Sequence, residues 1–367
     1  MNKIEKLLVI VGRTFFVCVC AFLVVWILTW AFHFATDTSE KPPFTLYSAG
    51  IDDFAMFKNE DSGKHYYDSH TNEYTEAQFY EILPTFYCKQ LIVNEKLPDT
   101  LYGRPVSAKF IQNENFTFKT APAAVNKREI ALYPLMESMS GRVDLEMPTD
   151  VFRITENAIE FVDMATNSVD ETKSDLFTKM FVQKGFAFPA HIISGNPTTK
   201  KEYDNGYLIT DSNDKLFHLK MQRGRPYLRP IVLPDGIVPK HIFVTEFRNQ
   251  QSLAFISDIE NRFWMLDAKN YEFQKAEIPD FNPETDGMMI IGNFHDWTVS
   301  VSSGDQLRYF ALAADDLHCL KSCEVPEEEL TKLQRIGNFL LPIQLKFLSG
   351  LDGDVWPRVA VLGKSAW

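Results

Sequence analysis

The sequence predicts a mainly β protein that a single helix near the N-terminus holds in a membrane. Two observations lead to this prediction: an uncharged apolar run at residues 14–34, and strand–turn–strand segments that recur 47 residues apart in the second half of the chain. The expected fold is a set of β-propeller-like repeats preceded by a small α+β module. An antiparallel β-sandwich is the alternative, in which the segments resemble one another by chance.

The composition is that of a folded, acidic protein. Of its 367 residues, 45% are hydrophobic and 23% are charged, and the formal net charge is −12. A chain with this hydrophobic share can bury a core, which excludes wholesale disorder. The acidic balance argues against a nucleic-acid partner, because phosphate binding needs a basic surface.

The apolar run (TFFVCVCAFLVVWILTWAFHF) has the length of a transmembrane helix. At a rise of about 1.5 Å per residue it crosses a hydrocarbon core of about 30 Å. It is longer than the apolar region of a cleaved signal peptide, which favours an uncleaved anchor that contacts lipid. Lys3, Lys6 and Arg13 precede it, so the positive-inside rule places the tail in the cytoplasm. We therefore expect a single-pass protein of the plasma (inner) membrane with a large extracytoplasmic, periplasmic domain.

Changes in composition divide the chain into six segments. These are a cytoplasmic tail (1–13), a transmembrane helix (14–34), a linker (35–45), a small α+β module (46–148), a propeller-like β-rich repeat region (149–326), and a short helix with a closing β-hairpin (327–367).

Within the α+β module, Thr75 and Gln78 have the spacing of a capping box and predict that a helix begins there. Residues 107–112 and 115–119 have the pattern of strands. One further helix is predicted near residues 174–182, inside the repeat region.

The repeats are visible as aligned segments. Residues 208–219 (LITDSNDKLFHL) align with 255–266 (FISDIENRFWML), and residues 299–310 (VSVSSGDQLRYF) form a weaker third copy. Each reads as two strands joined by a polar turn. Because one four-stranded blade cannot bury both of its faces alone, such units are expected to stack. We expect Phe217 and Trp264 to occupy equivalent, buried positions.

The last segment is predicted to begin with a helix over residues 327–336, which Gly337 would stop. Strands at 339–347 and 355–362 would follow as a hairpin. A terminal strand pair is one way to close a ring of blades.

The most unusual loop of the chain covers residues 195–206 (GNPTTKKEYDNG). It is dense in turn-forming and polar residues between two predicted strands, so it is a candidate binding loop for an anion or a protein partner. Its simpler interpretation is a long connection within the fold. The candidate binding residues are Asn196, Thr198, Lys200, Lys201, Tyr203 and Asp204.

Other clusters give weaker signals. His65, Asp68 and His70 lie close together in the sequence, and Asp68 and His70 could share a face that suits a metal, but a third coordinating group at the right spacing is missing. If residues 317–325 form a strand, Cys319 and Cys323 lie about 13 Å apart, too far for a disulfide, whereas a turn between them would allow one. We assign no catalytic residue, no metal ligand and no cofactor.

Several stretches resemble an uncharacterised bacterial family. They are LMESMSGRVDL at 135–145, DVFR at 150–153, SGNP at 194–197 and YDNGY at 203–207. The resemblance implies a single-pass, membrane-anchored extracytoplasmic protein of similar length, with a link to ABC-transporter components. The family has no assigned activity, so the resemblance implies no catalytic residue.

Two functions are compatible with these features. The leading hypothesis is a membrane-anchored extracytoplasmic interaction or scaffold protein, as an accessory subunit of an envelope or ABC-transport complex. The alternative is an envelope hydrolase or carbohydrate-binding protein, motivated by the 13% of aromatic residues and by acidic residues at hairpin turns. Two carboxylates roughly 5–10 Å apart in a central funnel would favour the hydrolase. A closed centre with an exposed apolar patch would favour the interaction protein.

Overall fold

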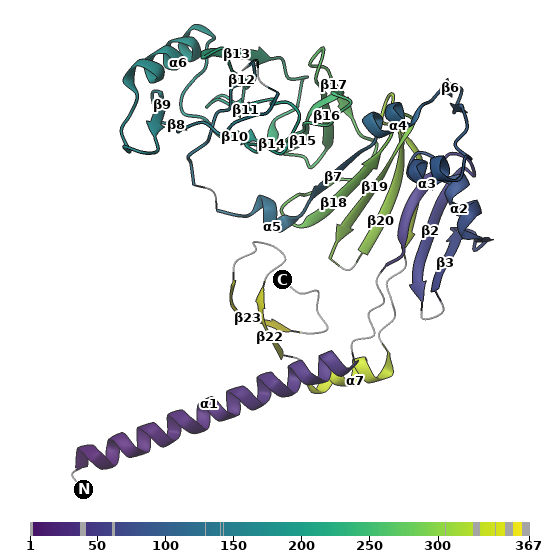
Figure 1. Ribbon diagram of the computed structural model, residues 1–367. Helices are drawn as coiled ribbons and strands as arrows, with labels where there is room; N and C mark the ends of the chain where they lie inside the picture. The colour runs from purple at the N-terminus through teal and green to yellow at the C-terminus, as the bar shows by residue number, and fades with distance from the viewer. Residues whose placement is uncertain are drawn as a thin grey trace.

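A computed structural model describes residues 3–36, 42–60, 63–128, 130–139, 141, 143–304, 306–325, 331–341, 343–348 and 355–361. Most of the protein is built from antiparallel sheets. One long helix, α1 (Lys3–Thr36), projects away from them (Figure 1).

Four larger sheets make up the β-rich part. In each of them, four strands that follow one another in the sequence lie side by side in the same order. The first sheet holds β1 (Phe44–Ser48), β2 (Asp53–Glu60), β3 (Gly63–Asp68) and β4 (Glu73–Tyr74). The second holds β10 (Ile192–Gly195), β11 (Tyr207–Thr210), β12 (Leu216–Gln222) and β13 (Arg225–Ile231). The third holds β14 (Pro239–Val244), β15 (Ser252–Asp258), β16 (Phe263–Asp267) and β17 (Phe273–Lys275). The fourth holds β18 (Asp286–Gly292), β19 (Asp296–Ser303), β20 (Gln306–Ala313) and β21 (Cys319–Val325), with β7 (Phe116–Thr120) added beside β18.

Shorter elements cover these sheets. The strand pairs are β5 (Thr100–Leu101) with β6 (Arg104–Pro105), and β8 (Asp150–Ile154) with β9 (Ile159–Asp163). The helices are α2 (Glu76–Ile82), α3 (Cys88–Val93), α4 (Ala108–Glu114), α5 (Pro122–Val125) and α6 (Glu171–Gln183).

The layers follow one another in an arc (Figure 1). From one end they are α6 with β8–β9, then the second, third and fourth sheets, and finally the first sheet. Separate apolar clusters fill the spaces between neighbouring layers: Phe217 lies between α6 and the second sheet, Ile256 between the second and third, and Val299 between the third and fourth. Burial of both sheet faces is what stacked blades achieve. The predicted fold class, mainly β with propeller-like repeats, is confirmed.

The aligned segments are equivalent in the structure. In each of the second and third sheets they form the second and third strands, and Ile209 pairs with Phe217 just as Ile256 pairs with Trp264. The weaker third copy also forms the second and third strands of its sheet, where Val299 pairs with Phe310.

The burial expected for Trp264 is only partly correct. Phe217 is 1% exposed, whereas Trp264 is partly buried and its indole N–H donates to Asp258 at 3.0 Å. An indole that keeps a polar partner at the end of a sheet cannot be fully enclosed by apolar side chains.

A repeated aspartate turn explains the polar residues between the paired strands. Asp211 Oδ1 accepts the backbone N–H groups of residues 213 and 215, at 2.8 and 2.9 Å. Asp258 does the same for residues 260 and 262, at 3.0 and 2.9 Å. Both carboxylates are fully buried. The carboxylate oxygens of Asp211 and Asp258 are therefore used by the turns themselves.

The α+β region differs from its prediction in one element. Thr75 and Gln78 form the predicted capping box at the start of α2. Residues 107–112, predicted as a strand, instead belong to α4, because the Ser107 side chain caps the N–H of Phe110 and starts a helix. The next predicted strand is present as β7. It pairs with β18, so the N-terminal region contributes to the fourth sheet.

The C-terminal segment lies beside α1 and away from the sheets (Figure 1). Its helix, α7 (Lys332–Leu340), is followed by the hairpin of β22 (Ile343–Leu348) and β23 (Val355–Val361), and both α7 and β22 contact α1. The hairpin therefore does not close the arc of sheets. Residues 327–330 of the predicted helix lie outside the described residues.

The prediction that Gly337 stops the helix is wrong. Gly337 lies inside α7, where a Cβ atom would be 1.8 Å from Cε1 of Phe32 in α1. The missing side chain lets the two helices approach closely, which is the use that helix pairs in membranes make of small residues. Gln334 Nε2 adds a hydrogen bond of 2.9 Å to the carbonyl oxygen of Thr36.

Candidate functional site

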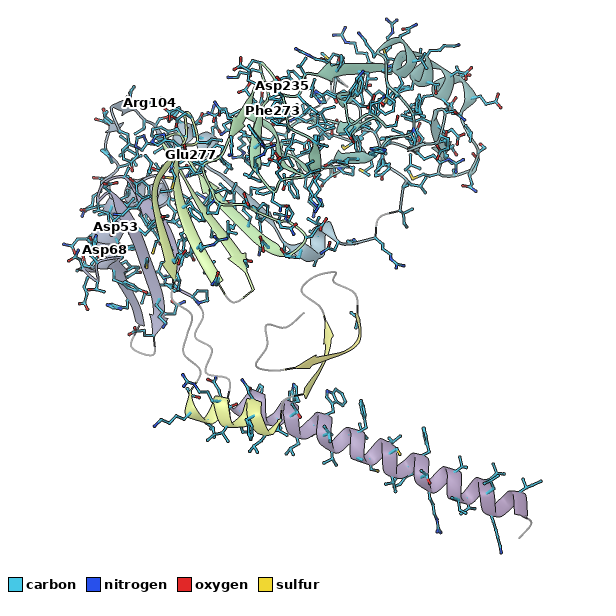
Figure 2. All side chains as sticks on the ribbon, turned by 180° about the vertical axis from the view of Figure 1, so that it is seen from behind. Asp53, Asp68, Arg104, Asp235, Phe273 and Glu277 are labelled. Atoms are coloured by element: carbon cyan, nitrogen blue, oxygen red, sulfur yellow. The ribbon has the colours of Figure 1, made fainter. Side chains whose placement is uncertain are left out.

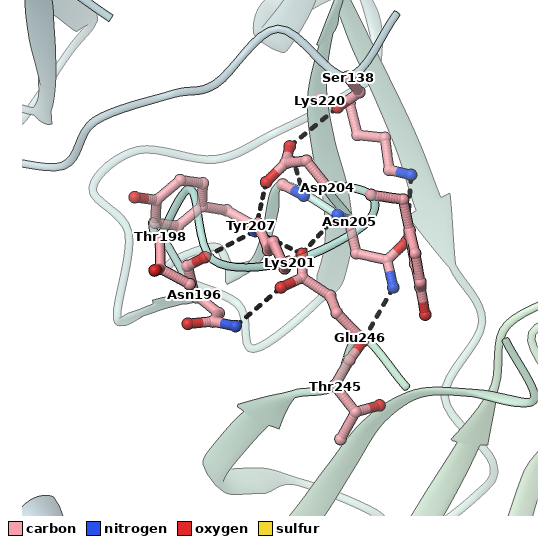
Figure 3. Close-up of polar contacts among 12 residues, drawn as sticks. Ser138, Asn196, Thr198, Lys201, Asp204, Asn205, Tyr207, Lys220, Thr245 and Glu246 are labelled. Carbon is pink, nitrogen blue, oxygen red and sulfur yellow. Dashed lines mark hydrogen bonds and ion pairs between the residues drawn. The ribbon is translucent and has the colours of Figure 1, made fainter. Parts of the chain in front are cut away.

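The predicted binding loop connects β10 to β11 and lies against the turn that follows β14 in the next sheet (Figure 3). The loop thus brings residues 195–206 of the second sheet together with residues 245–248 of the third. Both segments connect the first and second strands of their sheets, so stacking of the sheets makes them neighbours.

Lys201 forms the centre of this site. Its Nζ atom lies 2.7 Å from Asp204 Oδ1 and 2.6 Å from Glu246 Oε1, and it also donates to the carbonyl oxygen of Asn196 at 2.6 Å. The three charged side chains are at most 5% exposed. Burial of one such charge alone would be costly, so the cation and the two carboxylates stabilise one another.

Both carboxylate oxygens of Glu246 also accept hydrogen bonds from the loop. Oε1 accepts the backbone N–H of Asn205 at 2.7 Å, and Oε2 accepts the Asn196 amide at 2.8 Å. The Asn205 amide in turn donates to the carbonyl oxygen of Thr245 at 2.9 Å. Burial raises the pKa of Glu246, and the bonds from Asn205 and Lys201 oppose that rise.

Asp204 ties the loop to the N-terminal region. Its Oδ2 atom accepts the Ser138 hydroxyl at 2.9 Å and the backbone N–H of Gly206 at 3.0 Å. On the other side, Lys220 Nζ donates to Asn205 Oδ1 at 3.2 Å, and burial lowers the pKa of Lys220. The network therefore joins two lysines and two carboxylates from three parts of the chain (Figure 3).

His218 extends the network into the sheet as a neutral group. Burial lowers its pKa to about 4, so the ring is uncharged at neutral pH. Nε2 lies 2.6 Å from the carbonyl oxygen of Asn205 and must donate to it. Nδ1 then accepts the hydroxyl of Tyr271, which is 2.8 Å away in the third sheet.

The six predicted residues divide into two groups. Lys201 and Asp204 belong to the buried network, and the exposed Asn196 hydrogen-bonds to it. Thr198 accepts the backbone N–H of Lys200 at 3.2 Å, and Tyr203 donates its hydroxyl to the carbonyl oxygen of Phe247 at 2.7 Å. Lys200 is exposed. Binding by these residues stays a prediction.

A groove of about 340 Å³ lies along the loop. Phe118, Tyr203 and Phe247 contribute aromatic walls. Exposed Glu202 and Arg248 line it too and form an ion pair of 2.9 Å. The groove thus combines an aromatic surface with exposed charged side chains, while the charges beneath it are already paired.

Sequence reasoning missed Glu246, Ser138 and Lys220. Glu246 follows Asn205 by 41 residues and lies on another sheet. The repeat could have indicated Glu246, because residue 246 lies in the turn of the third sheet that corresponds to loop 195–206 of the second sheet. Nothing in the local pattern indicates Ser138, which lies 66 residues before Asp204.

The two carboxylates of the network also bear on the hydrolase hypothesis. Asp204 and Glu246 bind the same ammonium, so their oxygens lie within about 5 Å of each other, close to the spacing in retaining glycosidases. Their side chains are only 3% and 2% exposed, and Lys201 lies between them. A sugar could not reach either oxygen in this arrangement.

The weaker candidate clusters have structural roles. Asp68 accepts the N–H groups of His70 and Asn72, both at 2.9 Å, and lies near Asp53 on the first sheet (Figure 2). His65 faces Glu73 instead, at 3.3 Å. The predicted trio therefore does not converge.

Cys319 and Cys323 both lie on β21 as free thiols, as the strand argument predicted. Among the described residues, one trio of metal-ligating type is close together: Asp315, Asp316 and His318. All three are exposed, and His318 Nδ1 lies 2.5 Å from Asp316. Exposed groups that already bind one another do not define a site.

The chain belongs to the family described as a domain of unknown function, DUF4857, whose model matches residues 44–312. Among curated proteins, none matches the chain significantly.

Solved structures give only distant likenesses. The β-propeller domain of Cps50 (Swd1) from Myceliophteria thermophila is 11% identical with a TM-score of 0.27, over 65% of this chain and 68% of that one. Kuenenia stuttgartiensis hydrazine synthase gives 11% and 0.27, over 54% and 51%. The WD40 domain of SCAP from fission yeast gives 8% and 0.31, over 90% of each chain. Scores this low carry no argument, so the fold assignment rests on the strand order of this chain. This chain spans about half the length of the hydrazine synthase chain.

Proposed function

We propose that this protein is a membrane-anchored extracytoplasmic interaction module, which presents the groove along loop 195–206 to a protein partner. One observation carries the proposal. The buried charges Lys201, Asp204 and Glu246 saturate one another, so the loop is held in one shape and these three groups are already paired. A preformed surface of this kind suits recognition, because little ordering entropy is lost on binding.

The groove also has the composition of an interface. Aromatic side chains provide contact area at low entropic cost, and Tyr203, Phe118 and Phe247 line it. Glu202 and Arg248 stand more than half exposed at 62% and 58% and can exchange their mutual ion pair for partner charges. Charges at a rim mainly set partner choice and association rate.

The membrane part of the proposal rests on α1. Its apolar stretch, Lys6–Thr36, covers 31 residues, which is more than the roughly 20 that a bilayer core requires. Apolar side chains along it are exposed to the surroundings, as lipid-facing residues are. A signal sequence passes the same test of length and composition, so orientation and cleavage need direct measurement.

The helix α7 gives the anchor a second membrane contact. It packs on the C-terminal end of α1 and leaves four apolar side chains in the open: Leu333, Ile336, Phe339 and Leu340, at 56%, 55%, 83% and 67% exposure. Arg335 and Asn338 lie on the opposite, polar side. An amphipathic helix beside a membrane span is suited to the lipid interface.

The partner class is a proposal that the predicted membrane placement and the family resemblance support. We place the module in an envelope complex, with a transporter assembly of the ABC class as the first partner to test. Photo-crosslinking in native membranes provides the test. A benzophenone amino acid at Arg248 should give an adduct with one envelope protein, and the charge reversal Lys200→Glu should weaken it.

The matched control is the same amino acid at Val232, which is 88% exposed in the turn after β13. An adduct at both positions, or at Val232 alone, would contradict a partner in the groove. An adduct at Arg248 that Lys200→Glu leaves unchanged would count against recognition by the rim charges.

A further inference from the structure

A second pocket lies between the first and fourth sheets. It encloses about 260 Å³ and is lined on its apolar side by Leu46, Phe86 and Phe116. The backbone N–H of Tyr47 in β1 donates to the Thr298 hydroxyl of β19 at 2.9 Å and joins the two sheets at this point. The volume is below the roughly 300–1,000 Å³ of drug-sized sites, so only a small ligand would fit.

A buried carboxylate without a cation forms part of the pocket wall. Asp296, at the start of β19, is 3% exposed. Its Oδ1 atom accepts the side-chain amide of Asn293 at 3.0 Å. Within the described ranges, no lysine, arginine or histidine forms an ion pair with Asp296, unlike the buried carboxylates around Lys201. An uncompensated carboxylate is costly to bury, and a cationic ligand would remove that cost.

A second acceptor lines the same pocket. Asn115 Oδ1 is buried and has no hydrogen-bond partner among the residues that the structure describes. Its amide nitrogen donates to the carbonyl oxygen of Thr85 at 2.7 Å, which fixes the orientation of the amide. The reversed orientation would place two oxygens together. The pocket wall therefore combines a carboxylate that has no cation, an amide oxygen that has no hydrogen-bond partner among the described residues, and apolar side chains.

We propose that this pocket binds a small organic cation with at least two N–H donors, such as a primary ammonium group on a short apolar body. Asp296 is its counter-ion, Asn115 Oδ1 is the second acceptor, and the apolar walls enclose the body of the ligand. A charge-assisted hydrogen bond to a buried carboxylate is roughly twice as strong as a neutral one.

The titratable groups around Asp296 leave its charge uncompensated. They are Tyr47 of β1, Tyr102 of the β5–β6 turn, and the adjacent His295, which stacks on Tyr102 at 4.1 Å between ring centroids. Burial raises the pKa of both tyrosines and lowers the pKa of His295, so all three are neutral near pH 7. Burial also raises the pKa of Asp296 to about 7. Binding a cation needs the ionised carboxylate and should weaken about tenfold per pH unit below 7.

Titration calorimetry of the full chain in nanodiscs tests the proposal, with benzylammonium as the probe. Benzylammonium should bind at pH 8, and at pH 6 its affinity should fall about tenfold. The neutral isostere benzyl alcohol should bind at least tenfold more weakly than benzylammonium at pH 8. Asp296→Asn should remove the difference between the two probes, and Asn115→Ala should weaken benzylammonium alone.

The control variant is Asp316→Asn, whose carboxylate is exposed and lies outside the pocket. It should bind benzylammonium as the wild type does. Equal affinity for both probes, no heat with either, or benzylammonium binding that survives Asp296→Asn would overturn the proposal. The thermal unfolding of Asp296→Asn, followed by its near-UV circular dichroism, shows whether loss of binding reflects loss of the fold.

Discussion

At the scale of single residues, the two candidate sites differ in whether their buried charges are paired. Lys201 neutralises Asp204 and Glu246 where the second and third sheets meet. Among the described residues, no cation pairs with Asp296 where the first and fourth sheets meet. The first arrangement fixes a surface and the second leaves a site open to a ligand.

Replacing Lys201 by Met should show how much the charge of this residue contributes to the stability of the loop. The variant leaves two carboxylates buried without a cation, so the free energy of unfolding should fall by about 3–5 kcal/mol. Lowering the pH should recover part of the loss, because a protonated carboxyl group carries no charge and burial already raises the pKa of Glu246. Urea unfolding of the full chain in detergent at pH 5 and pH 8 measures both effects.

The matched control is Lys200→Met, at the exposed neighbouring position. It should change the free energy of unfolding by less than about 0.5 kcal/mol. Equal effects of the two substitutions would show that the buried network does not stabilise the loop.

Phe217 and Trp264 test whether equivalent positions contribute equally to the free energy of unfolding. Phe217→Ala should cost about 3–5 kcal/mol, the range for a large aromatic side chain in a closed core. Trp264→Ala should cost less than about 3 kcal/mol, because part of the ring is already in contact with solvent. Denaturant unfolding of both variants measures the difference. A larger cost for Trp264→Ala would contradict the burial described for the two positions.

At the scale of elements, the sequence predicts strands best where a hydrophobic pattern and a turn signal coincide. The segments 208–219 and 255–266 have both, and their strands, pairing and register agree with the prediction. Residues 107–112 lack a turn signal, and the side-chain cap of Ser107 makes them a helix. The role of Gly337 could not be predicted from its neighbours, because its contact, Phe32, lies about three hundred residues earlier in the chain.

The contact of Gly337 with Phe32 should hold α7 against α1. Gly337→Leu places side-chain atoms in the space of the Phe32 ring, so the helices must separate. The backbone amides of α7 should then exchange faster with deuterium, which mass spectrometry of the full chain in nanodiscs would detect. Asn338→Leu, at the next position of the same helix, should leave the exchange of α7 unchanged. Unchanged exchange in Gly337→Leu would show that α7 does not depend on this packing.

At the scale of the whole molecule, stacking accounts for both the fold and the candidate site. Neighbouring sheets place corresponding turns side by side, and this brings Glu246 to a loop whose own sequence already contains Lys201 and Asp204. Half of the network could therefore be predicted from one loop. The contribution of Glu246 could be predicted only by knowing which sheets are neighbours. The period of the repeat does not give that order by itself.

The orientation of the chain in the membrane is the property on which the proposed function depends most directly. The basic residues before the apolar run predict that the N-terminus is cytoplasmic and that everything after residue 35 lies outside. Trypsin added to intact spheroplasts should then digest the sheets and leave an N-terminal epitope tag on a short, membrane-protected fragment. Spheroplasts lysed with detergent serve as the control, because trypsin should remove the tag there. Protection of the sheets in intact spheroplasts would mean the reverse orientation, in which the groove faces the cytoplasm and an envelope partner could not reach it.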